Sequence, residues 1–166
     1  MPETQTQAEA VQKIAKLIKG VRIAMFTTIE EEGHLHSRPM ALQDVEFDGD
    51  IWFFTNKSAP KVHQIEQEPR VNVAFSDPEH QIYVSLSGRA SLVLDKAKNH
   101  ELWNPSLNAW FPGGVEDPDL ALIKIDVDGA EYWDSPSTVV AHITGFVKSK
   151  LSGESADVGD HAKVEL

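Results

Sequence analysis

The chain has 166 residues, 41% of them hydrophobic, which is enough to bury one sizeable core and fits a single domain. It contains no cysteine, which excludes disulfides, thiolate nucleophiles and metal sites built on sulfur ligands. A formal net charge of −11 would repel a phosphate backbone at long range, so we expect no nucleic-acid partner.

The sequence shows no sign of membrane insertion or export. Its apolar runs are shorter than the roughly 20 residues needed to cross a bilayer. The N-terminal residues, MPETQTQAEA, lack both the basic start and the apolar core of a signal peptide. We therefore expect a soluble, cytoplasmic protein that does not bind a membrane.

The first predicted element is a helix. Apolar residues recur at helical spacing from Val11 to Ile18, and Gly20 follows as a C-cap, which predicts an amphipathic helix over 7–19.

Strand-forming sequence begins directly after this helix. VRIAMFTTI, HLHSRPMALQ, VEF and IWFFT predict an antiparallel meander with a turn at EEEG and a hairpin at Asp48–Gly49. Farther on, RVNVAF, QIYVSLSG and RASLVL predict three strands with a bend at Gly88, and LALIKIDV and AEYWD predict two more around Asp128–Gly129.

Three further helices are expected. Residues 58–67 form a short helix that stops before Pro69, a second begins at the N-cap Asp95, and a third covers about 137–151. We expect residues 152–166 to be a disordered acidic tail, which leaves 1–151 as the domain. Short strands with a few helices between them predict a mainly β fold, a small antiparallel barrel.

The start of the short helix carries residues that suit an anion. Ser58 is placed as an N-cap, Pro60 fits the first turn, and Lys61 lies in the same turn. A cation at a helix N-terminus opposes the helix dipole, whereas a phosphate there would meet free N–H groups and both side chains. A lysine that simply points into solvent explains the same residues equally well.

A second cation lies on an earlier strand. Because Pro39 forces its predecessor into an extended conformation, Arg38, Met40 and Leu42 share one strand face while Pro39 and Ala41 share the other. An arginine among apolar neighbours needs an anionic partner if it is buried. The partner is either a carboxylate of this chain, which has 26 of them, or a ligand.

Four motifs resemble those of the pyridoxamine 5'-phosphate oxidase-like, FMN-binding split barrels, and within them the general stress protein 26-like branch. They are SRPMAL (37–42), IWFFTNKSAPKVHQIEQEPRVNVAF (51–75), YVSLSGRASLV (83–93) and AEYWDSPS (130–137), in the family's order and spacing. The resemblance implies a six- to seven-stranded antiparallel split β-barrel that forms a homodimer with FMN in grooves at the subunit interface.

The resemblance also implies which residues hold the cofactor. Arg38 and Lys61 would grip the phosphate with the help of Ser58. The remaining expected contacts come from strand residues beside the ring and ribityl chain and from two aromatic residues: Pro39, Met40, Ala41, Phe54, Thr55, Tyr83 and Trp133. It assigns no catalytic residue and no metal site.

Several positions depart from the biosynthetic oxidase. Pro60 replaces a second basic residue beside Lys61, and Gln43 replaces a lysine that faces the flavin. Tyr83 stands where that enzyme has a glutamine. The Arg-Leu-His-x-Arg segment that holds its substrate is absent after EYWD. We therefore do not expect pyridoxamine phosphate oxidation.

Two other groups of residues remain open. His34 and His36 would face one side of a strand, where a metal site competes with the simpler interpretation of exposed histidines near a turn. Trp103, Trp110 and Phe111 supply apolar area that suits a core or an interface, or a wall beside the flavin.

The sequence thus favours an FMN-dependent oxidoreductase of unknown substrate, with NAD(P)H as one possible electron donor. Two alternatives stand beside it: a non-enzymatic stress protein that binds or senses flavin, and a reductase that uses a deazaflavin.

Overall fold

The computed structural model describes residues 6–134 and 160–166, and the statements below refer to these residues. Its helical elements are α1 (Gln7–Ile18), η1 (Glu31–Gly33), α2 (Pro60–Gln67), α3 (Lys96–Leu102) and η2 (Pro105–Ala109). Its strands are β1 (Ile23–Ile29), β2 (Leu35–Ala41), β3 (Asp50–Asn56), β4 (Arg70–Asp77), β5 (Ile82–Val93), β6 (Leu120–Asp134) and β7 (Asp160–Glu165).

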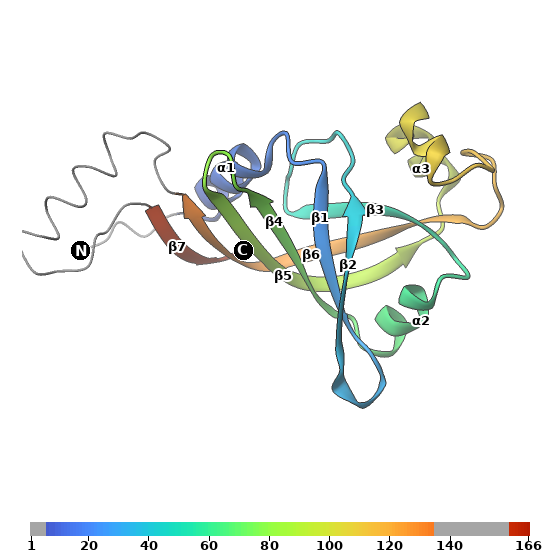
Figure 1. Ribbon diagram of the computed structural model, residues 1–166, viewed down its shortest axis with the longest axis horizontal. Helices are drawn as coiled ribbons and strands as arrows, with labels where there is room; N and C mark the ends of the chain where they lie inside the picture. The colour runs from blue at the N-terminus through green and yellow to red at the C-terminus, as the bar shows by residue number, and fades with distance from the viewer. Residues whose placement is uncertain (1–5, 135–159) are drawn as a thin grey trace, which may run out of the picture.

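All the strands belong to one antiparallel sheet in the order β2-β1-β4-β5-β6-β3, and β7 also pairs with β6 (Figure 1). The first half of β6 pairs with β3 and the second half with β7, so these two strands follow one another along the same edge. This arrangement confirms the expected mainly β, antiparallel split barrel.

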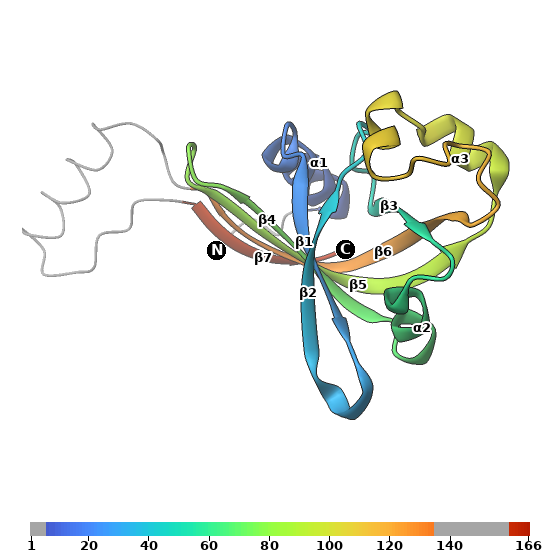
Figure 2. The same ribbon diagram turned by 45° about the vertical axis from the view of Figure 1, so that its right-hand side comes forward.

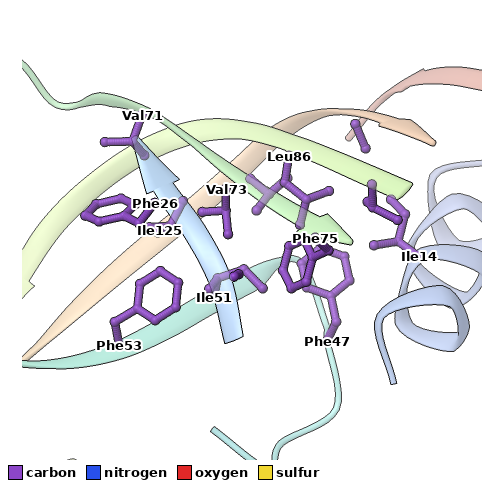
Figure 3. Packing of buried hydrophobic residues seen from close by; sticks show 14 of the residues in the cluster. Ile14, Phe26, Phe47, Ile51, Phe53, Val71, Val73, Phe75, Leu86 and Ile125 are labelled. Atoms are coloured by element: carbon purple, nitrogen blue, oxygen red, sulfur yellow. The ribbon is translucent and has the colours of Figure 1, made fainter. Parts of the chain in front are cut away.

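The sheet curls until strands that are not hydrogen-bonded face each other across the core. Phe26 of β1 and Phe53 of β3 lie four strands apart in the sheet order, yet their ring centroids are only 5.4 Å apart. Figure 3 shows these two rings among the aliphatic side chains of β4, β5 and β6. Among the described strands β2 and β3 are not hydrogen-bonded neighbours, and this gap is the split in the barrel.

The predicted bend at Gly88 is present, but the strand breaks predicted there and at Asp128–Gly129 are wrong, because β5 and β6 each continue as one strand. The register between the two strands shifts there: Ser87 pairs with Gly129 but Gly88 pairs with Val127. Asp128 is therefore the extra residue of a β-bulge, which bends the two strands without ending them.

The predicted hairpin at Asp48–Gly49 is also wrong. Residues 42–49 are not in a strand, and β3 pairs with β6 instead. Phe47 explains the difference, since its side chain is only 5% exposed within the core. Burying that ring draws the preceding segment across the end of the barrel, away from an edge-to-edge pairing with β3.

Helix α1 covers one end of the barrel (Figure 1). Thr6 and Glu9 form a capping box at its start, and Ile14 and Leu17 bury its apolar face in the core. A 3.0 Å ion pair between Lys13 and Asp134 links the helix to the end of β6. The predicted first helix is thus confirmed, ending one residue earlier at Ile18.

The C-terminal prediction needs a partial correction. Residues 160–165 of the expected disordered tail form β7, paired with β6 from Gly129 to Asp134. The backbone groups along the edge of β6 account for this order, since a paired strand satisfies them. The helix predicted at about 137–151 lies outside the described residues. Of the described helices, none is long and apolar enough to span a membrane.

The bulge makes Gly88 a sensitive position. A Cβ there would lie 2.1 Å from the backbone oxygen of Asp126, a distance that requires the backbone to move. We expect Gly88→Ala to lower the free energy of unfolding by about 1–3 kcal/mol, measured by thermal or urea denaturation. Gly129→Ala is the matched control, because its added Cβ would meet nothing within 4 Å. Equal stability of the two variants would contradict the packing at the bulge.

Candidate functional site

The β1–β2 hairpin extends from the sheet with α2 beside it (Figure 2). Alternation along β1 places Phe26, Thr28 and Glu30 on one side, and Arg38 of β2 is paired directly with Phe26. This side faces the core and α2, because Phe26 and Thr28 are both fully buried. The candidate site is built here, between the hairpin and the helix.

Arg38 is held by several contacts in this position. Its guanidinium carbon lies 5.6 Å from the centroid of the Phe26 ring, in cation–π geometry. Its Nη2 donates to Thr28 Oγ1 at 2.8 Å and to Gln64 Oε1 at 3.1 Å, and Nη1 donates to the Phe26 carbonyl at 3.4 Å. The guanidinium is therefore fixed by neutral acceptors and forms no ion pair among the described residues.

Helix α2 brings a second cation to the same place. Lys61 and Gln64 are three residues apart, so they lie on one face of the helix, and Gln64 contacts Arg38 directly. Lys61 is half-buried and makes no ion pair or hydrogen bond in the described part of the chain. A lysine with a half-buried stem can still reach solvent with its ammonium group, so the simpler interpretation stays open beside the anion site.

Electrostatics shows that the two cations are close enough to repel each other. Burial, followed by the charge of Arg38, lowers the pKa of Lys61. Burial also lowers the pKa of Arg38, against an opposing effect of the Glu30 charge. Two partly desolvated cations side by side are unfavourable without an anion, so the site is suited to bind one.

Glu30 lies nearby, but its oxygen atoms are directed to other residues. Its Oε1 accepts from Gln64 Nε2 at 3.1 Å and lies 2.5 Å from His36 Nδ1. The His36 hydrogen bond is the main reason that the pKa of Glu30 is lowered. The carboxylate is thus separated from Arg38 by the Gln64 amide and does not neutralise it directly.

The prediction of Ser58 as the N-cap of α2 is wrong. Ala59 is the N-cap residue, and no side chain caps the helix. The Ser58 hydroxyl donates to Asp119 Oδ2 at 2.7 Å, and its N–H donates to Asp119 Oδ1 at 3.3 Å. The local sequence could not reveal this partner, which is 61 residues away. A contact between Ser58 and a phosphate stays a prediction, and it would have to replace the hydroxyl bond to Asp119.

The alternation predicted for β2 is confirmed. Met40 and Leu42 pack against the main core on the same side as Arg38, while Pro39 is exposed on the other side. Ala41 shares the side of Pro39 and is half-buried.

The two predicted β3 residues face opposite ways. Thr55 is 1% exposed, and its hydroxyl donates to the Asn56 carbonyl at 3.3 Å. Phe54 is buried in a second apolar cluster with Trp103 and Phe111, whose ring centroids lie 5.5 Å and 6.3 Å from its own. The Phe54 ring is therefore taken up by packing in this cluster, which leaves the β3 backbone to contact a ligand.

Tyr83 and Trp133 lie on the outer face of the sheet, opposite the core, and are paired directly across β5 and β6. They are 43% and 40% exposed, and His161 of β7 stacks on the Trp133 ring at 5.1 Å between centroids. Tyr83 is three strands from Arg38, roughly 14 Å at the usual strand spacing, and on the opposite face. One chain therefore does not bring all the predicted residues together.

Of the remaining open groups, Trp103 and Phe111 are half-buried and pack against the second apolar cluster, while Trp110 is 69% exposed. His34 and His36 are exposed beside Glu32 and Glu30, with the interpretation as turn-proximal histidines favoured. The described residues contain no group of three or more side chains placed to hold a metal ion.

Sequence reasoning missed three members of the site: Thr28, Glu30 and Gln64. A signal for the first two was present, because in FTTIE every second residue from Phe26 faces the same side as Arg38. Gln64 follows the clamp lysine by one helical turn, which places both on the same face. Their convergence depends on how α2 packs on β1, and no local pattern fixes that.

Comparison with known proteins identifies the family of this chain. The family model described as Pyridoxamine 5'-phosphate oxidase like matches residues 9–157. The chain belongs to this family. Protein bli-3 of Neurospora crassa is similar to this member of the family, with 28% identity over 160 residues, covering 90% of this chain and 77% of bli-3.

Solved structures show the same family likeness. A protein described as general stress protein 26 from Jannaschia sp. CCS1 is 27% identical with a TM-score of 0.76, covering 96% of this chain and 100% of its own. A general stress FMN/FAD binding protein from Xanthomonas citri is 37% identical with a TM-score of 0.68, covering 79% and 92%. The expected membership in the family and its general stress branch is thus confirmed.

The lowered pKa of Lys61 has a consequence for stability. A lysine whose pKa is lower in the folded than in the unfolded chain opposes folding below that pKa, and this opposition fades as the pH rises past it. We expect Lys61→Met to stabilise the ligand-free protein near neutral pH by less than about 1 kcal/mol, because solvent screens a half-buried charge. The gain should shrink at alkaline pH.

Chemical denaturation of the ligand-free protein at several pH values measures this effect. Lys57→Met, at an exposed lysine four residues earlier, is the matched control and should change stability little. A destabilised Lys61→Met protein would mean that the lysine has a favourable partner.

Proposed function

We propose that the protein binds FMN, with the flavin phosphate held by Arg38 and Lys61. One observation carries the proposal: Lys61 shares a face of α2 with Gln64, which bonds directly to Arg38, and neither cation forms an ion pair among the described residues. The charge of Arg38 also contributes, after burial, to the lowered pKa of Lys61. A dianionic phosphate would relieve this repulsion, and two cationic donors at once give charge-assisted hydrogen bonds.

The chemistry of the donor set fits such a phosphate. The Arg38 Nε makes no hydrogen bond within the described residues, and Lys61 offers an ammonium group in the first turn of α2. No side chain caps that turn, so its N–H groups can also face an anion. FMN also needs an apolar slot for its ring, for which Met40 and the backbone of β2 and β3 are the expected walls.

The similarity to the FMN/FAD binding protein of Xanthomonas citri supports flavin as the ligand class. FMN suits the site better than a ligand without phosphate, because the two cations would otherwise remain uncompensated. When bound, the flavin would supply hydride or electron transfer, and the protein would supply grip, orientation and electrostatics. We therefore infer a flavin-dependent oxidoreductase, and NAD(P)H is the electron donor that we would test first.

We further propose that the complete flavin site forms in a homodimer. The outer face of the sheet carries Ile23, Met25, Tyr83 and Trp133, which are 48%, 42%, 43% and 40% exposed. Apolar side chains gathered on one sheet face suit a protein interface. A second chain packed on this face would place Tyr83 and Trp133 of one subunit near the groove that contains Arg38 and Lys61 of the other subunit.

The FMN proposal predicts a loss of affinity in clamp variants. Arg38→Ala and Lys61→Met should each weaken FMN binding about tenfold or more, as expected for a lost charge-assisted bond. Riboflavin, which has the same ring and no phosphate, should bind both variants and the wild type alike. Titration of the ligand-free proteins by flavin fluorescence measures both constants. Unchanged FMN affinity in the double variant would refute the clamp.

The same titration separates the proposal from its alternatives. If the wild type binds a deazaflavin but not FMN, the proposed cofactor is wrong. Mass spectrometry of the co-purified ligand identifies which flavin is bound. Bound FMN with no turnover of NAD(P)H and an artificial acceptor would favour a flavin-binding protein without this enzymatic activity.

The homodimer proposal predicts that Met25→Asp converts a dimer to a monomer, because a carboxylate would be desolvated at the centre of the outer face. Sedimentation or light scattering at micromolar concentration measures the mass. Leu94→Asp is the matched control, since Leu94 is 66% exposed and precedes α3, away from the outer face. A wild type that is strictly monomeric would overturn the proposal.

A further inference from the structure

Gln64 occupies a position between two groups of opposite charge. Its Oε1 accepts from Arg38 Nη2 at 3.1 Å and from the Thr28 hydroxyl at 2.8 Å. Its Nε2 donates to Glu30 Oε1 at 3.1 Å. The three side chains on the core-facing side of the hairpin are thus joined through one amide that comes from α2.

The chemistry of the neighbours fixes the orientation of this amide. Arg38 can only donate hydrogen bonds and an ionised Glu30 can only accept them, so the oxygen must face the arginine and the nitrogen the carboxylate. A neutral amide is the side-chain group that satisfies both at once. A carboxylate at this position would repel Glu30, and a lysine would repel Arg38.

The contacts also decide which N–H groups of Arg38 remain for a ligand. Both hydrogens of Nη2 are used, one by Thr28 and one by Gln64. Nη1 uses one hydrogen for the Phe26 carbonyl. In the part of the chain that the structure describes, Nε and the other Nη1 hydrogen have no acceptor. These two N–H groups lie on different sides of the guanidinium, because Nη1 is cis to Cδ and the Nε hydrogen lies on the Nη2 side. Each can therefore donate singly to an oxyanion, with a charge-assisted hydrogen bond.

We infer that Gln64 is a positioning residue for anion binding: it holds Nη2 of Arg38, so that the unused Nε and Nη1 hydrogens remain for the phosphate, and it keeps Glu30 from pairing with the guanidinium. This inference rests on the proposed phosphate clamp. Gln64 itself need not touch the ligand, because both of its polar atoms are already bonded within the protein. Its effect passes through the orientation and the available charge of Arg38.

The test compares FMN with riboflavin, since only FMN carries the phosphate. Gln64→Met keeps the length of the side chain but removes both polar atoms, and it should weaken FMN binding about tenfold. Gln64→Glu should weaken it further, because its carboxylate would pair with Arg38. Riboflavin affinity should stay within about twofold of wild type in both, as no phosphate bond is lost. Gln67→Met, at an exposed glutamine of the same helix, is the control.

The outcomes distinguish the inference from the proposal beneath it. A wild type that binds FMN no better than riboflavin would overturn the phosphate clamp, and the inference with it. A wild type that prefers FMN, with the preference kept in Gln64→Met, would overturn the inference alone. An equal loss for both ligands would likewise overturn it, by showing a merely structural role. If Gln64→Met does not fold, the nearly isosteric Gln64→Glu gives the same comparison, and an unchanged preference there is equally negative.

Discussion

The repulsion between Arg38 and Lys61 is the constraint around which this part of the molecule is organised. Neither cation forms an ion pair in the described chain, although acidic residues are abundant, and one of them, Glu30, is held one amide away. We expect such an arrangement to lower the stability of the ligand-free protein. It is useful only if an anion compensates for it, so binding and stability are linked: the groups that weaken the free protein are those that should strengthen the complex.

The fold makes this arrangement possible by leaving the barrel open. Because β2 is not hydrogen-bonded to β3, the side of β2 that carries Arg38 meets α2 instead of another strand. Helix α2 then brings Lys61 and Gln64 from a segment more than 20 residues later in the chain. The cation–π contact of Arg38 with Phe26 joins the site to the core, because the Phe26 ring also packs against the ring of Phe53.

The sequence predicted the strands and the pair of cations more reliably than the turns and caps. Strand identity depends on alternation within a segment, and the alternation around Arg38 and Met40 survives in the structure. The hairpin at Asp48–Gly49 and the strand breaks at Gly88 and Asp128–Gly129 failed for one reason: glycine and aspartate favour turns locally, but long-range pairing of β5 and β6 and the burial of Phe47 outweighed that preference. Ser58 failed as a cap for the same reason, because a distant aspartate took its hydroxyl. The role of Gln64 required knowledge of helix placement that no single segment contains.

The position of β7 also matters for strand pairing at the edge of the sheet. β7 covers the edge of β6 from Gly129 to Asp134, and His161 lies flat on the Trp133 ring. A chain shortened before β7 would leave unpaired amide and carbonyl groups along that half of β6, next to a bare indole surface. Exposed edges of this kind recruit strands from other molecules. β7 therefore satisfies backbone groups that would otherwise be open to intermolecular pairing, a structural role separate from any ligand that the barrel holds.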